Sequence, residues 1–314
     1  MKKPPFSASG LAVLVFFGAL GAASGDLGIR REGEVLHVEV DGAPFADLRH
    51  EGFRRPILYP IIGPHGVEMT RNYPMKEGVA GEAADHPHHQ SLWYAHGDVN
   101  GVDFWSNRGK IVQIEVEEAS ANGNEALIVT RNRWETLDGK EVCRDKRRLR
   151  FSVLEEGARA IDFSITLEAS NGDATFGDTK EGTLAIRTHP ALRLKGEVAT
   201  GRAVNSERQR DGELWGKAAK WVDYWGEVGG KTVGVAILDH PSNPRHPTTW
   251  HARDYGLVAV NPFGWNDFFE GKKGRGDLTI KGGSSLTFRY LFVFHEGDAE
   301  TAKIREIYAK FSDS

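Results

Sequence analysis

Hydrophobic and polar residues alternate with a period of two along most of the chain, as is typical of β-strands with one buried face. The segment KIVQIEVEEA places Val112, Ile114 and Val116 on one face and most of its charged residues on the other. RAIDFSITLEAS repeats the pattern, and Asp41-Gly42 between two such runs is a strong hairpin signal. The pattern predicts many antiparallel strands joined by tight turns.

Helical spacing is clear only near the C-terminus. In AETAKIREIYAKF, Ile304, Ile307 and Phe311 recur at the intervals of an amphipathic helix, and Asp298 precedes them as a candidate N-cap. No Pro- or Ser-rich linker divides the chain, and we find no internal repeat. We therefore predict that residues 26–314 form a single all-β domain. Its architecture would be a large antiparallel two-sheet β-sandwich with a C-terminal helix.

The first 25 residues follow a different pattern. Lys2 and Lys3 precede LAVLVFFGALGAA, an apolar run with the length of a signal-peptide core, and small residues follow it. The run is too short to span a membrane comfortably. We expect residues 1–25 to be a signal peptide and the mature protein to be periplasmic or secreted, without membrane association. Cys143 is the sole cysteine, so no internal disulfide can form, and we expect it on a half-buried strand.

The charge balance argues against a nucleic-acid partner. Lys and Arg total 40 and Asp and Glu total 44, which gives a formal net charge of −4. Proteins that bind nucleic acids usually show a basic surplus on one face. We therefore look for a small-molecule partner.

Four histidines and an aspartate are concentrated in DHPHHQSLWYAHG, residues 85–97. On an extended chain His86 and His88 point to one side and His89 to the other, while Pro87 favours a loop or a sheet edge. Three roles are open: substrate binding or proton transfer, part of a metal site, or a hydrogen-bonded polar loop. A divalent metal would need three ligands from the histidines of this and a later segment: His86, His88, His240, His246 and His251.

A second polar segment is FGDTKEGTLAIRTHPALRL. Asp178, Lys180 and Glu181 lie together in it, and Arg187 and His189 follow on an apparent strand. Such charges are often surface ion pairs of little energetic value. These charges lead into an apolar strand, however, and loops that precede rigid strands often carry function.

A third segment, GELWGKAAKWVDYWGEVGG, interleaves Trp215 and Trp221 with Lys217. Aromatic rings that stack on the C–H faces of a sugar, beside charged groups that bind its hydroxyls, would show this pattern. A core of large side chains would show it equally well.

The fourth segment, LDHPSNPRHPTTWHARDYGLVAVNPFGW, contains Trp250 and His251 in what must be a long irregular loop. Long loops in a compact domain are usually functional. Histidines at 86–96, 189 and 240–251 could therefore meet in one cleft.

These segments together resemble a family of exported bacterial proteins of unknown function labelled "methane oxygenase PmoA-like". The resemblance rests on DHPHHQSLWYAHGDVNGVDFW, FGDTKEGTLAIRTHP, GELWGKAAKWVDYWG and AILDHPSNPRHPTTWHARDYGLVAVNPFG, and covers most of the mature chain. More distantly, the layout resembles galactose-mutarotase-type sugar enzymes. That likeness implies a mutarotase-like two-sheet supersandwich, with a histidine acting as acid and a carboxylate as base on a sugar ring. HHQSLW is similar to the His-Gly-aromatic region of those enzymes, and Glu270 is the nearest candidate for their late catalytic glutamate.

We therefore expect an exported carbohydrate-active enzyme that acts on a small sugar or glycoside by epimerisation, elimination or hydrolysis. The candidate proton donors are His88 and His89, with His189 as a rival, and the candidate bases are Asp178 and Glu181. The candidate substrate-binding residues are His86, Lys180, Arg187, Trp215, Lys217, Trp221, Trp250 and His251. Lys180 or Arg187 would stabilise developing negative charge, and the three tryptophans would be stacking surfaces.

The first three histidines of the 85–97 segment are expected to line one cleft with Asp178, Lys180, Glu181 and His251. Two alternatives remain open: a non-catalytic glycan-binding protein, and a metal-dependent enzyme that uses the histidines. No cofactor is expected unless the histidines bind a divalent metal. The oligomeric state is left open.

Overall fold

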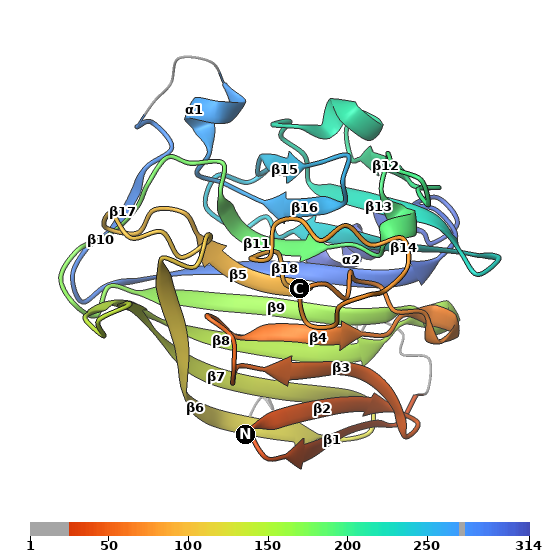
Figure 1. Ribbon diagram of the computed structural model, residues 1–314, viewed down its shortest axis with the longest axis horizontal. Coiled ribbons are helices and arrows are strands. Elements are labelled where there is room, and N and C mark those ends of the chain that lie inside the picture. The colour runs from red at the N-terminus through yellow and green to blue at the C-terminus, as the bar shows by residue number, and fades with distance from the viewer. Residues whose placement is uncertain (1–24, 270–273) are drawn as a thin grey trace, which may run out of the picture.

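The computed structural model describes residues 25–269 and 274–314, and two eight-stranded antiparallel sheets face each other in it (Figure 1). The first sheet has the order β1 (Leu27–Glu32), β2 (Val35–Val40), β3 (Ala43–Arg49), β4 (Ile57–Ile61), β5 (Leu92–His96), β11 (Gly182–Arg187), β16 (Leu257–Val260) and β15 (Trp250–Ala252). The second has the order β12 (Arg202–Asn205), β13 (Trp221–Val228), β14 (Lys231–Asp239), β18 (Ser285–Glu296), β9 (Arg159–Glu168), β8 (Glu141–Val153), β7 (Glu125–Thr136) and β6 (Gly109–Ala121). The predicted two-sheet sandwich is confirmed.

Short elements complete the fold. β10 (Ala174–Phe176) pairs with β17 (Leu278–Ile280), and α1 (Trp265–Phe268) is a single turn. The 3₁₀ turns are η1 (Pro64–Gly66), η2 (Glu155–Gly157), η3 (Pro190–Leu192) and η4 (Asp211–Leu214). In the part of the chain that the structure describes, no helix is long and apolar enough to cross a membrane. The predicted signal peptide lies outside the described residues, except for Gly25.

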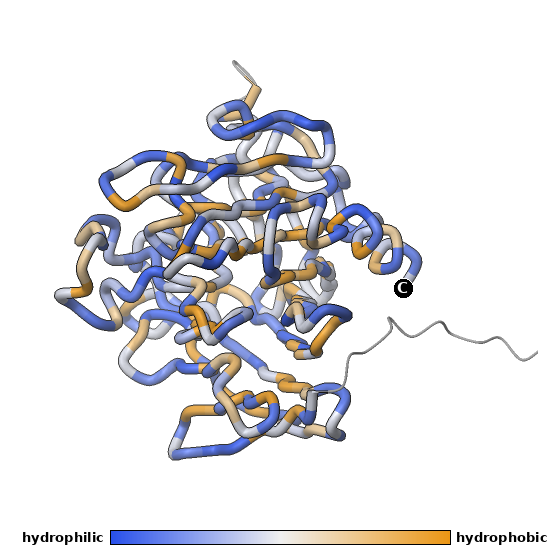
Figure 2. Tube along the Cα trace, turned by 90° about the vertical axis from the view of Figure 1, so that its right-hand side faces the viewer, coloured by the Kyte–Doolittle hydropathy of each residue, from blue (hydrophilic) through white to orange (hydrophobic). Residues whose placement is uncertain are grey.

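The core between the sheets is built by the period-two pattern. On β9, Ile161, Phe163 and Ile165 point inward and are at most 2% exposed. Tyr94 of the first sheet stacks on Phe163 of the second, with ring centroids 6.4 Å apart. Figure 2 shows hydrophilic loops at the periphery and hydrophobic stretches concentrated inside. Cys143 lies on β8 and is fully buried, deeper than the half-buried position expected from the sequence.

The C-terminal helix α2 (Ile304–Ser312) is confirmed, but it begins later than predicted. Asp298 accepts a hydrogen bond from the Thr301 backbone and caps a preceding turn, and Lys303 with φ 54° separates that turn from the helix. Ile304 packs on the outer face of the second sheet in an apolar cluster that includes Trp221 of β13. Trp221 therefore packs on the outer face of the second sheet, away from the histidine segment, and does not share a site with it.

Strand register builds the outer face of the first sheet near its β15 edge. Four residues form one row across neighbouring strands. In order, they are Trp93 on β5, Ala185 on β11, Ala259 on β16 and His251 on β15. Directly opposite residues share a face, so an aromatic ring and a histidine flank two alanines. Trp105 contacts both ends of this row, with centroids 5.2 Å from Trp93 and 6.5 Å from His251. Since neighbouring strands are about 4.8 Å apart, Trp105 must lie over the two alanines.

The long connection between β4 and β5 follows the end of β11, where it appears as an orange segment in Figure 1. Arg71 donates its backbone N–H to the Arg187 carbonyl, and His189 donates to the Met69 carbonyl. These bonds bring the histidine-rich segment to the face that carries Trp93 and His251.

Candidate functional site

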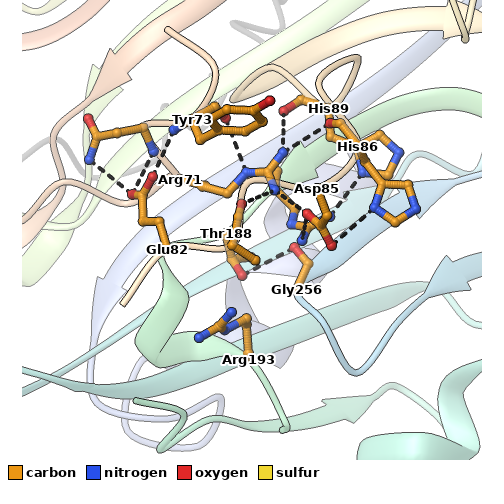
Figure 3. A network of polar contacts seen from close by, with 12 residues as sticks. Arg71, Tyr73, Glu82, Asp85, His86, His89, Thr188, Arg193 and Gly256 are labelled. Carbon is orange, nitrogen blue, oxygen red and sulfur yellow. Dashed lines mark hydrogen bonds and ion pairs between the residues drawn. The ribbon is translucent and has the colours of Figure 1, made fainter. Parts of the chain in front are cut away.

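Asp85 lies beside Arg71 and His86 at the start of the histidine segment, as Figure 3 shows, and it also pairs with Arg187 of β11. Its Oδ1 accepts from Arg71 at 2.5 Å and from Arg187 at 2.9 Å, and its Oδ2 lies 3.1 Å from Nδ1 of His86. Burial alone would raise the pKa of this carboxyl, but the charge of Arg187, the hydrogen bond from His86 and the charge of Arg71 together lower it. Two cations thus share this carboxylate, and the charge of Glu82 also acts on Arg71.

Arg71 holds the histidine segment in place. Its guanidinium is almost fully buried and donates to the carbonyls of Tyr73, Ala83, His86 and His89 as well as to Asp85. Burial of an arginine is costly unless all of its donors are satisfied. This network therefore fixes the conformation of residues 85–89.

The rings of this segment stack against one another and against the sheet. His89 lies parallel to His86 at 4.8 Å and to Trp93 at 5.4 Å, and His86 stacks on Tyr255 at 5.3 Å. His88 meets the His89 ring edge-on at 4.5 Å. We use the name ring cluster for these and the adjoining rings: His86, His88, His89, Trp93, Trp105, Trp215, His251 and Tyr255.

His89 is a neutral hydrogen-bond donor. Its Nδ1 lies 3.0 Å from Nη1 of Arg187, and because a guanidinium only donates, Nδ1 must accept. The ring proton is then on Nε2. Burial, followed by the charges of His88 and Arg187, lowers the pKa of His89 far below its ordinary value. Burial and the charge of Arg55 likewise lower the pKa of His88 to about 4.

His251 has the opposite tautomer. Its Nδ1 lies 2.8 Å from the Lys180 carbonyl and must donate to it, so Nε2 carries a lone pair. Burial lowers the pKa of His251 to about 3, although the bond to Lys180 opposes this shift. Trp105 touches both histidines, at 5.7 Å from His89 and 6.5 Å from His251. A neutral donor and a neutral acceptor therefore both adjoin one indole ring.

Both Nε2 atoms remain available to a ligand. Neither Nε2 atom has a hydrogen-bond partner among the described residues. Neither is among the polar atoms that are both without a partner and closed off from solvent. His89 and His251 therefore retain contact with solvent through Nε2, although each residue as a whole is only 2% exposed.

The second predicted segment is divided between two environments. Asp178 accepts backbone hydrogen bonds from Asn266 and Gly276, and these occupy both of its carboxylate oxygens. This places Asp178 as a loop-fixing residue, and among the described residues no contact joins its carboxylate to the ring cluster. Glu181 is half-buried, forms an ion pair with Lys180 at 3.2 Å and raises the pKa of Tyr255, after burial and against two arginines. Glu181 follows directly after Lys180, whose carbonyl accepts from His251, so Glu181 and not Asp178 is the carboxylate of this segment that lies next to the cluster.

Several predicted residues lie elsewhere. His189 accepts a hydrogen bond from Ala191 and caps η3, so it does not join His88 and His89. Trp250 is fully buried and donates from Nε1 to the Ala219 carbonyl, which makes it a core residue and not a stacking surface. Lys217 is exposed on the loop after η4.

His240 and His246 also leave the predicted cleft. His246 pairs with Asp239 at 2.7 Å, and His240 lies against Phe311 of α2 at 5.0 Å. Of the three histidines in the fourth segment, only His251 reaches the ring cluster. Over residues 25–269 and 274–314, no three His, Cys, Asp or Glu side chains are grouped to hold a metal ion. The histidines therefore do not fit the metal site considered from the sequence.

His96, the fourth histidine of the 85–97 segment, is enclosed in the sandwich. Its Nε2 donates to the Gly177 carbonyl at 2.7 Å, and burial lowers its pKa to about 4. It therefore serves packing at the end of β5. Glu270, the candidate for a late catalytic glutamate, lies outside the described residues.

Sequence reasoning missed Arg55, Arg71, Trp105, Arg253 and Tyr255. Trp105, Arg253 and Tyr255 stand within the quoted segments, and their aromatic or cationic character was the available signal. Arg55 and Arg71 stand outside these segments, and nothing in their neighbourhoods marks them as buried.

Among solved structures, the chain is similar to a galactose 1-epimerase from Lactobacillus acidophilus NCFM, with 8% identity, a TM-score of 0.39, and coverage of 87% of this chain and 99% of the other. It is also similar to a GalM/aldose epimerase homologue from C. elegans, with 8% identity, a TM-score of 0.33 and the same coverage. A polysaccharide lyase matches with 13% identity and a TM-score of 0.34 over 93% of this chain. The chain spans about a third of that lyase, 35% of its length. No curated protein sequence matches the chain.

The expectation of a family of unknown function is confirmed, while the label "PmoA-like" forms no part of the family description. A sequence model described as "Family of unknown function (DUF6807)" matches residues 35–309. The chain belongs to this family.

Proposed function

We propose that the protein binds a small sugar or glycoside at the ring cluster and acts on it by acid–base chemistry. The observation that carries the proposal is the pair of neutral histidines, His89 with a donor and His251 with an acceptor, that both adjoin Trp105. Sugar hydroxyls both donate and accept hydrogen bonds, and the C–H faces of a sugar ring pack on aromatic rings. The cluster offers both kinds of contact side by side.

The roles of the two histidines follow from their tautomers. Nε2 of His251 would accept a hydrogen bond from the reacting sugar hydroxyl, and Nε2–H of His89 would donate a hydrogen bond to the oxygen that gains negative charge. Because burial lowers the pKa of His251 to about 3, its ring is a weak proton acceptor, and Glu181 is the candidate base. His89 would act as a neutral donor, because burial and adjacent cations disfavour its imidazolium. Arg187 acts through His89 and is therefore a positioning residue.

The arrangement favours epimerisation or elimination over hydrolysis. Glycoside hydrolysis generally uses a pair of carboxylic groups, one as acid and one as base or nucleophile. Here Asp85 is held by two arginines, and Glu181 is paired with Lys180. Because the pKa of Asp85 is lowered, Asp85 is not placed to serve as a general acid.

The test combines binding and turnover. We would screen a panel of aldoses and methyl glycosides by saturation-transfer NMR, follow conversion of bound compounds by proton NMR, and repeat both with His89→Ala and His251→Gln. Both variants are expected to lose turnover at least tenfold while retaining the wild-type circular dichroism spectrum. His65→Ala serves as the matched control, because His65 lies outside the cluster and pairs with Glu296.

Two outcomes would redirect the proposal. Sugar binding without any conversion by the wild-type protein would make it a non-catalytic glycan-binding protein. No binding of any sugar, with the fold intact, would contradict the proposed function.

A further inference from the structure

A hollow of about 360 Å³ adjoins the ring cluster. Its wall includes Trp215, Arg253 and Asp254, and its rim includes Lys195 and Arg202. This volume falls within the usual range of small-molecule sites, about 300–1,000 Å³. Trp215 belongs to both regions, because its ring also meets His251 edge-on at 4.8 Å. A ligand that touches His251 could therefore extend past Trp215 into the hollow.

The charges of the hollow are balanced except at one residue. Lys195 is paired with Asp254 at 3.0 Å, and Arg202 is paired with Asp211 at 3.0 Å. Arg253 forms no side-chain hydrogen bond or ion pair with any residue that the structure describes. Its guanidinium is the unneutralised cation of this wall.

Two rings hold that guanidinium in a defined position. It lies 4.7 Å from the centroid of Trp215 and 5.4 Å from that of Tyr255. Packing against aromatic faces restrains an arginine while its N–H groups stay free at the edge. A restrained guanidinium with free N–H groups is suited to bind a carboxylate through two parallel hydrogen bonds.

The adjoining cluster adds to this positive potential. Arg187 lies 4.6 Å from the ring centroid of Tyr255, the ring that also packs on Arg253, and Asp85, its ion-pair partner, is shared with Arg71. A surplus of one sign in a recess attracts ligands of the opposite sign.

We infer that the ligand of this site is an acidic sugar, a uronate or uronate-containing glycoside, whose carboxylate is bound by Arg253 in the hollow next to Trp215. This inference rests on the proposed function and adds the substrate class to it. The sugar ring would pack on Trp215, and its reacting carbon would face His251 and His89.

The experiment compares acidic sugars with their neutral counterparts. Dissociation constants of methyl glucuronoside and methyl galacturonoside are measured by NMR titration against methyl glucoside and methyl galactoside. We expect each acid to bind at least tenfold more tightly at low salt, and this preference to shrink as ionic strength rises. Arg253→Met should reduce the affinity for the acids to that for the neutral sugars, and Arg253→Lys should restore part of it.

Arg202→Met is the matched control, because it removes a cation from the same hollow that is already paired with Asp211. It should change the preference for the acids by less than twofold. If neutral and acidic sugars bind equally and Arg253→Met has no effect, the inference is overturned while the proposed function stands. If no sugar of either kind binds, both fail. The comparison of sugars on the wild-type protein still decides the question should a variant not fold.

Discussion

Arg187 on β11 donates a hydrogen bond to Nδ1 of His89 over 3.0 Å, although 98 positions separate the two residues. The bond determines which nitrogen of His89 bears the proton. Because Arg187 stands on a central strand and is itself held by Asp85, the ring of His89 is oriented by the sheet and not by its own loop.

Arg187→Met should therefore change both the protonation of His89 and stability. Removal of one partner from a buried ion pair costs about 3–5 kcal/mol, and we expect about 3 kcal/mol because Asp85 keeps Arg71. Urea unfolding measures this loss, and ¹⁵N NMR of the histidine rings reports the tautomer. An unchanged ¹⁵N pattern for His89 would show that Arg187 does not set the tautomer. The exposed pair Arg202–Asp211 provides the contrast, where loss should stay within about 1 kcal/mol.

The protein should lose stability in mild acid through its buried histidines. The pKa values of His88 and His251 are lowered to about 4 and about 3, so the unfolded chain binds protons that the folded state excludes. Their contribution is fully present above the unfolded value of about 6.5 and is lost as the pH falls from there towards 3. Each group adds up to about 1.4 kcal/mol per pH unit in that window.

His251→Gln should lower the number of protons taken up on unfolding by one. The unfolding free energy should therefore depend less steeply on pH. The measurement is the free energy of unfolding between pH 7 and pH 4 for the wild-type and variant proteins. Equal slopes for the two proteins would show that His251 is not buried in its neutral form. His50→Gln, which alters a histidine in another part of the fold, is the control.

Trp215 and Trp250 should separate binding from stability. Trp250 is completely buried in the core and contacts neither solvent nor ligand. Trp250→Ala should therefore cost about 3–5 kcal/mol in unfolding free energy. Trp215 is only partly buried beside His251, so Trp215→Ala should weaken sugar binding with a smaller loss of stability. Thermal unfolding and NMR titration of both variants test these roles. If Trp250→Ala were stable but failed to bind sugar, Trp250 and not Trp215 would be the binding residue.

Asp178 and Glu181 should differ in the same way. Asp178→Asn keeps one carbonyl acceptor for the amides of Asn266 and Gly276, so it should retain turnover with a modest loss of stability. Glu181→Gln removes the carboxylate that lies next to the ring cluster and should lower turnover. Kinetics on a converted sugar would distinguish the two, and a larger loss for Asp178→Asn would return it to the role of base.

The fold was predictable because alternation is a property of each strand alone. The period-two run of β9 determines which of its residues are buried, and no knowledge of distant partners is needed. On β18 the pattern fails, because residues 290–295 are buried on both faces. The start of α2 was predicted too early because Asp298 caps a turn before the helix, and an N-cap residue looks the same in both settings.

The site was predictable only in part, because strand parity decides which of two adjacent residues faces it. Trp250 and His251 are neighbours on β15, so one must enter the core and the other must face outward. The sequence offers both as candidates without choosing. His246 and His251 are close in sequence, yet His246 pairs with Asp239 and contacts Tyr308 of α2, away from the ring cluster. Arg71 could not be found because its role depends on carbonyls contributed by a segment more than ten residues away.

The two alanines beneath Trp105 have a consequence for how this site can change. Ala185 and Ala259 contribute only methyl groups to the outer face. Their small size lets the indole of Trp105 lie close to the sheet, in contact with His89 and His251. The distance between the donor on His89 and the acceptor on His251 thus depends on two alanines that carry no reactive group. A larger residue at either position would lift the indole and widen or tilt the gap while every ionisable group stayed in place. Selectivity among ligands of different size can in this way be tuned from the sheet beneath the site.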